Sequence, residues 1–174
     1  AFATDGTLVA TTTKSIVSLD PKTLAVKSTF TQAGAEFVTG PVVFKLGDRD
    51  VVAAATKDGR VLLLNAASLD GSPLHASAPG TVSTAADALA TWQELTITAA
   101  PAPPPAAAGA PAAGFGGGGG NAPTVTSGTR WILAPTSTGL VAFKVTDAGG
   151  SISLEKGWAA QGLAASATPI VVNG

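Results

Sequence analysis

The hydrophobic pattern of the chain is a series of short apolar runs separated by turn residues. In the clearest stretch, residues 51–65, two apolar runs flank Lys57, Asp58 and Gly59. Asp-Gly supplies the positive φ angles that a tight hairpin turn needs, and apolar runs of this length suit strands. The stretch therefore predicts an antiparallel β-hairpin.

The same shape recurs on either side of this stretch. The runs 8–12 and 15–20 form one further predicted hairpin, and the runs 131–134 and 140–144 form another. A third strand is expected after each hairpin; the candidates are residues 25–30, 72–75 and 151–158. Residues 41–44, 84–93 and 168–174 are expected to supply a further strand each. Residues 84–93 are also rich in the helix formers Ala and Leu, but the repeat favours a strand there.

The spacing of the hairpins predicts the fold class. Asp20 to Asn65 is 45 residues and Asn65 to Lys144 is 79, a difference of 34, while residues 95–129 form an uncharged stretch of 35 between the last two markers. Without that insertion the period is about 45 residues. Four short strands in such a period are typical of a β-propeller blade. We therefore expect an all-β chain of about three blades, as part of a larger propeller or of an assembly of several copies.

These aligned units resemble the PQQ-like (quinoprotein-like) β-propeller repeat. The resemblance rests on residues 8–23, 51–65 and 131–144 and on the Pro-apolar strands at Pro41 and Pro169. The sequence departs from the family's fuller pattern at one place: the family's motif ends in Thr-Gly, whereas here Leu24 follows Thr23. The resemblance implies an exported, periplasmic or extracellular bacterial protein. It is compatible with a non-catalytic scaffold and with a fragment of a quinone-dependent dehydrogenase, which would use PQQ and calcium.

Composition narrows the classes of partner. The net charge is −1, and only 12% of the residues are charged. This balance gives no electrostatic footprint for nucleic acid. The absence of cysteine excludes disulfides and thiolate metal sites within the chain, and no apolar run approaches the roughly 20 residues of a membrane-spanning helix. The chain begins at Ala1 without Met, so we expect a processed protein or an excerpt.

No residue is assigned a catalytic, cofactor-binding or metal-binding role. Expected turns explain Asp5, Asp58 and the pair Asp48 and Asp50 without a metal. The oxygen-bearing side chains that could hold calcium are Asp5, Asp48, Asp50, Asp58, Asp87, Asn121 and Asn173. His75 is the only histidine, which excludes a site with several histidines. The three tryptophans, Trp92, Trp131 and Trp158, are expected to pack between blades.

Residues 95–129 are the most individual feature of the sequence. They hold Pro103, Pro104 and Pro105, which favour polyproline II, followed by Phe115 and a run of five glycines that includes Gly118. The run is not a phosphate loop, because no Gly-Lys-Ser/Thr follows it. One interpretation is a flexible surface loop, and the other is an uncharged interaction arm for a protein partner or a neighbouring blade.

The last apolar run is a candidate strand-pairing edge. Pro169, Ile170, Val171 and Val172 repeat the Pro-Val-Val strand that begins at Pro41, so we expect them to pair outside this chain or with the strand near Leu8. The leading functional expectation is a non-catalytic binding or structural module. The alternatives are a dehydrogenase fragment whose active site lies in other blades and a subunit of a self-assembling extracellular structure.

Overall fold

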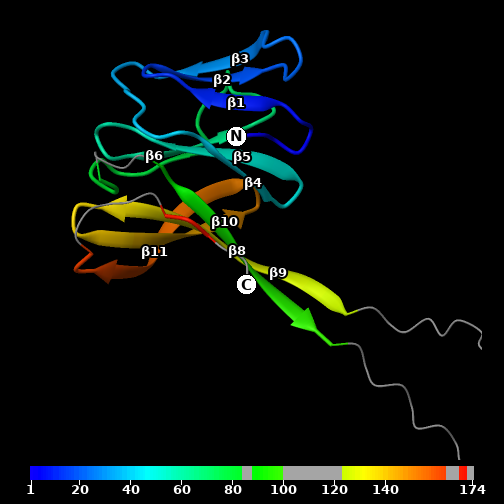
Figure 1. Cartoon of the computed structure of the whole chain (residues 1–174), viewed down its shortest axis with the longest axis vertical. Helices are drawn as coiled ribbons and strands as arrows, with labels where there is room; N and C mark the ends of the chain where they lie inside the picture. The colour runs from blue at the N-terminus through cyan, green and yellow to red at the C-terminus, as the bar shows by residue number, and fades with distance from the viewer. Residues whose placement is uncertain (84–87, 100–122, 164–168, 172–174) are drawn as a thin grey trace, which may run out of the picture. The chain divides into compact units, whose positions relative to one another are not determined.

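The computed structural model describes residues 1–83, 88–99, 123–163 and 169–171, which form eleven strands and no helix (Figure 1). The chain divides into two compact units, one of Ala1–Trp92 with Thr129–Gly174 and the other of Gln93–Gly128. The strands of the chain form three antiparallel sheets. The expected all-β class is therefore confirmed.

Each sheet follows the order of the chain, so strands that are neighbours in a sheet are also consecutive in the sequence. The first sheet contains β1 (Leu8–Thr11), β2 (Ser15–Leu19) and β3 (Val26–Thr31). The middle sheet contains β4 (Val42–Leu46), β5 (Arg49–Ala55), β6 (Val61–Asn65) and β7 (His75–Ala76). The last sheet contains β8 (Ala90–Thr98), β9 (Thr124–Thr136), β10 (Gly139–Ala148) and β11 (Ser151–Gln161).

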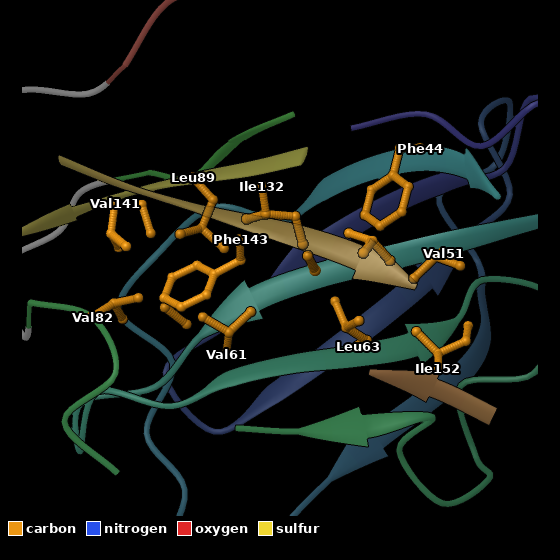
Figure 2. Close-up of a cluster of buried hydrophobic side chains, with 14 residues drawn as sticks. Phe44, Val51, Val61, Leu63, Val82, Leu89, Ile132, Val141, Phe143 and Ile152 are labelled. Carbon is orange, nitrogen blue, oxygen red and sulfur yellow. The ribbon is translucent and has the colours of Figure 1, made fainter. Parts of the chain in front are cut away.

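The middle sheet is buried on both faces, which explains its continuous apolar runs. Side chains alternate between the two faces along a strand, so a strand covered on both sides needs apolar residues at every position. One face packs against the last sheet in a cluster that includes Val61, Leu63, Ile132 and Phe143 (Figure 2). The opposite face packs against the first sheet; that cluster includes Val52, Ala54, Leu62, Leu64, Val9, Ile16 and Phe30.

A repeated backbone hydrogen bond shows that the three sheets are built alike. In each one, an amide beyond the outer strand donates to a carbonyl in the turn of the central hairpin. The three pairs are Phe37 with Thr13, Val82 with Gly59, and Gly162 with Thr138. The segments that lead into β4 and β8 also meet in a parallel bridge between Gly40 and Ala88. The period found in the sequence is thus a structural period.

Two expected segments differ from the structure. Residues 90–93 belong to β8, so the strand interpretation is correct there, but β8 continues to Thr98 and β9 begins at Thr124. Both ends of the expected loop 95–129 are thus strands. At the end of the chain, Pro169, Ile170 and Val171 lie outside any strand. Residues 84–87 and 172–174 lie outside the described part of the chain.

Candidate binding surface

The turn carboxylates are engaged by neighbouring backbone and hydroxyl groups. The Asp5 carboxylate accepts hydrogen bonds from the amide and the hydroxyl of Thr7, each at 2.9 Å. Asp20 accepts from the amides of Thr23 and Lys22, also at 2.9 Å. Hydrogen bonds to an ionised carboxylate favour that form, so they hold the pKa of both Asp5 and Asp20 below the ordinary value. These bonds support the turn interpretation of Asp5.

Asp58 has the same role in the central hairpin of the middle sheet. Its carboxylate accepts from the Thr56 hydroxyl and, at 2.7 Å, from Arg60 Nε. The Thr56 bond, followed by the Arg60 bond, lowers the pKa of Asp58. Next to this turn, Lys57 Nζ lies 2.7 Å from a Glu36 oxygen, and this pair lowers the pKa of Glu36 and raises that of Lys57.

The tip of the β4–β5 hairpin is more ordered than the expected solvated turn. Asp50 accepts from the amide and the hydroxyl of Thr4 at 2.6 Å each, and Arg49 forms an ion pair with Asp147 at 2.9 Å. Asp48 and Asp5 both line a cavity of about 280 Å³ beside this tip. Among the described residues, no three acidic or histidine side chains are grouped closely enough to hold a metal ion. Asp87, Asn121 and Asn173 lie outside the described residues.

His75 and the tryptophans do not meet at a common site in the described structure. His75 lies in β7 opposite Leu63. Trp92 and Trp158 are partly exposed, and Trp131 lies across Gly157, where an added Cβ would be 2.2 Å from its ring. Among the described residues, none of the three tryptophans belongs to either of the core clusters that lie between the sheets.

A second cavity, of about 470 Å³, lies where the loop at Thr81 meets β10 and β11. Its lining includes Phe143, Gln161 and Lys156, and Lys156 is the one charged side chain of that lining. The lining residues therefore hold no second titratable side chain with which Lys156 could form an acid and base pair.

The most distinctive surface is a two-stranded ribbon in the unit Gln93–Gly128, formed by residues 93–98 of β8 and 124–128 of β9. The side-chain amide of Gln93 donates to the Gly128 carbonyl at 3.3 Å, and a Cβ added to Gly128 would lie 2.9 Å from Glu94 Cβ. Glu94 and Gly128 are therefore opposite one another. Counting three residues along each antiparallel strand places Ile97 opposite Val125.

One face of this ribbon is apolar and exposed. Leu95 and Ile97 are two residues apart and share a face with Val125, and their exposed fractions are 61%, 68% and 57%. The other face carries Thr96, Thr98, Thr124 and Thr126. The sequence analysis missed this ribbon face, although the alternation Leu-Thr-Ile-Thr at residues 95–98 is a strand signal that could have found it.

The predicted arm and edge residues are only partly described. Pro103, Pro104, Pro105, Phe115, Gly118 and Val172 lie outside the described residues. Ile170 is 82% exposed, which leaves its predicted pairing with a strand outside this chain open to test. The first residues of the chain already occupy part of the β1 edge. The Ala1 amino group donates to the Val9 carbonyl, the Val9 amide donates to the Ala1 carbonyl, and Phe2 forms an isolated antiparallel β-bridge with Leu8.

Comparison with known proteins adds no relative. No protein-family model, curated protein or solved structure matches the chain. Within the described ranges, no helix has the length and apolarity needed to cross a bilayer.

Proposed function

We propose that this chain is a non-catalytic binding and structural module of an exported bacterial β-propeller protein of the PQQ-like kind. Its three sheets serve as consecutive blades, and the ribbon of β8 and β9 serves as the binding surface for a protein partner. The repeated bond between outer segment and hairpin turn supports the blade assignment. The turn carboxylates support a non-catalytic role, since Asp5, Asp20 and Asp58 hold the hairpins and turns.

The exposed apolar face of the ribbon carries the binding proposal. A two-stranded ribbon is marginally stable in water by itself, and within the described part of the chain no second layer buries Leu95, Ile97 and Val125. Contiguous exposed apolar side chains mark sites of protein association. Such a surface suits a partner that covers it with apolar side chains of its own. Ribbon residues 95–98 and 124–128 also lie within the predicted arm, residues 95–129, so both belong to one candidate interaction region.

Site-specific photo-crosslinking in the native host tests this function. A photoreactive residue at position 97 is expected to yield a defined adduct with one partner protein, and the Leu95→Thr, Val125→Thr pair should abolish it. The matched control places the same photoreactive residue at position 96, on the threonine face. The same adduct from both positions, or no adduct from position 97, would reject the binding role of the ribbon.

The dehydrogenase reading is tested separately with the purified full protein. We expect no calcium-dependent binding of PQQ and no PQQ-dependent oxidation of alcohols or sugars. A quinone absorbance that saturates with one PQQ per protein in calcium would favour the enzyme instead.

A further inference from the structure

Three Asp-Gly pairs of the chain offer the same chemistry in three different surroundings. They are Asp5-Gly6, Asp58-Gly59 and Asp70-Gly71. In an Asp-Gly sequence the glycine amide nitrogen can attack the carboxyl group of the aspartate side chain, because glycine has no Cβ to shield the nitrogen. The attack requires a carboxyl group that can turn towards the amide and an amide that no other acceptor holds. The hydrogen bonds of each pair therefore decide which pair can react.

The first two pairs are held in unreactive arrangements. The Gly6 amide donates to the Ala3 carbonyl and the Gly59 amide donates to the Thr56 carbonyl, each at 2.9 Å. In both pairs the carboxylate accepts two hydrogen bonds from neighbouring groups, and these bonds hold its pKa below the ordinary value. A lowered pKa disfavours the protonated carboxyl, which is the form that loses its hydroxyl group when the amide attacks.

The third pair, Asp70-Gly71, lacks the amide hydrogen bond that the other two have. Both of its residues are exposed in the loop between β6 and β7. Among the described residues, no backbone carbonyl accepts a hydrogen bond from the Gly71 amide or from any other amide of residues 69–72. The Asp70 carboxylate accepts one bond, from the Ser68 hydroxyl at 2.8 Å. The side chain and the amide of this pair can therefore approach each other without breaking a backbone hydrogen bond.

We propose that Asp70-Gly71 is a modification site at which isoaspartate forms spontaneously. The Gly71 nitrogen forms a bond to Asp70 Cγ, and the carboxyl hydroxyl leaves with the amide proton as water, which closes a succinimide ring. Water then adds to one of the two ring carbonyls. Opening at Cγ restores aspartate, whereas opening at the main-chain carbonyl carbon leaves Gly71 joined through Cγ, as isoaspartate. The water lost in the first step is regained in the second, and nothing is oxidised or reduced.

The position of this pair gives the modification a structural consequence. Leu69, directly before it, is fully buried in the cluster between the first and middle sheets. An isoaspartyl linkage lengthens the main chain by one carbon atom between Leu69 and Gly71, so the loop can no longer hold Leu69 in the same place without strain. We expect the isoaspartyl form, separated by chromatography, to unfold at a lower urea midpoint than the unmodified chain. An equal midpoint would refute this consequence.

Labelling with heavy oxygen tests the proposal, because each ring that hydrolyses in heavy-oxygen water leaves one heavy oxygen in the carboxylate. The purified protein is aged in such water at neutral pH, and peptides that separate the three Asp-Gly pairs are analysed by mass spectrometry. Electron-transfer fragmentation identifies the isoaspartyl product. The label at Asp70 should exceed that at Asp5 and at Asp58 by roughly tenfold or more, since those two sites must first open their hydrogen bonds. Equal labelling of the three sites, or no label at Asp70, would overturn the proposal.

Unfolding the chain separates the effect of the fold from that of the sequence. In concentrated urea the three Asp-Gly pairs should label at similar rates, because the hydrogen bonds that distinguish them are lost. A preference for Asp70 that persists in urea would refute the role of the fold. The labelling depends on neither the blade assignment nor the ribbon, so this proposal and the proposed function can fail independently.

Gly71→Ala is the matched variant for the attacking amide. The φ of Gly71 is not left-handed, and the nearest atom to an added Cβ is the Ser68 carbonyl oxygen at 3.7 Å, so alanine fits the folded loop. The variant should keep the urea midpoint of the wild-type chain and lose most of the label at Asp70, since the new Cβ shields the amide nitrogen. Unchanged labelling at Asp70 in this variant would overturn the attack by the Gly71 amide.

Discussion

Gly59 allows a direct test of how the hairpin turn of the middle sheet is packed. Its φ is +78°, and a Cβ built there would lie 2.7 Å from the Val82 carbonyl oxygen and 2.9 Å from the Gly80 backbone. These are backbone atoms, so no side-chain rotation relieves the contact. The loop is held by two hydrogen bonds, from the Val82 amide to the Gly59 carbonyl at 3.0 Å and from the Gly80 amide to the Asp58 carbonyl at 2.8 Å.

The expected cost of Gly59→Ala is the sum of a conformational and a contact contribution. A left-handed conformation costs a residue with a Cβ about 1–2 kcal/mol. Displacing the loop weakens two backbone hydrogen bonds, at about 0.5–1.5 kcal/mol each. The free energy of unfolding should therefore fall by roughly 2–5 kcal/mol.

Gly47→Ala is the matched control for the conformational contribution. Gly47 has a φ of +59°, and no atom lies within 4 Å of an added Cβ. The control should lose only about 1–2 kcal/mol. In urea unfolding followed by tryptophan fluorescence, a difference of about 2 kcal/mol between the variants would separate their midpoints by roughly 1 M. Equal losses for Gly59→Ala and Gly47→Ala would refute the close packing of residues 80–82 on the turn.

Three other predictions follow from burial, charge and stacking. Leu63→Ala should lower the free energy of unfolding by about 2–5 kcal/mol, because its site is fully buried, whereas Leu95→Ala should change it by less than about 0.5 kcal/mol in urea titration. The pKa of Asp58 is lowered in the folded protein, so the ionised carboxylate contributes to the free energy of unfolding at neutral pH and loses that contribution as the pH falls through the folded pKa. Asp58→Asn should therefore make the urea midpoint fall less steeply below about pH 4, and an unchanged slope would contradict this. Arg130 lies 5.5 Å from the Phe44 ring centre and donates to the Lys45 carbonyl at 3.3 Å, so Arg130→Lys should cost about 1 kcal/mol, seen as a lower thermal midpoint.

The hairpins could be predicted from the sequence because their signals are local. Asp58-Gly59 sets the turn, and the apolar runs on either side fix both strands and the burial of both faces. The β4–β5 tip was less predictable. Its charged residues were interpreted as a solvated turn, but Arg49 and Asp50 are strand residues that hold Asp147 and Thr4. These partners are 98 and 46 residues away along the chain, beyond the reach of a local pattern.

The extensions of β8 and β9 were missed for a different reason. The expectation for residues 95–129 came from their composition, in which Ala, Pro and Gly dominate. The ends of that stretch alternate Thr with Leu, Ile or Val, a strand pattern that is usually explained by one buried face. In the ribbon no such burial exists for Leu95, Ile97 and Val125 among the described residues. Pattern and composition therefore disagreed at these positions, and the pattern was correct.

The comparison of Leu24 with Leu69 shows what a repeated sequence can and cannot specify. The two leucines are 45 residues apart at corresponding places in the repeat, but Leu24 has a left-handed φ of 57° that Leu69 does not share, and one is 61% exposed whereas the other is 0% exposed. The strand pattern is encoded within each unit, whereas the burial of a side chain depends also on the local turn and on whether another sheet lies against it. The exposure of Leu24 is therefore not fixed by its place in the repeat, and single exposed leucines of this kind are common on protein surfaces.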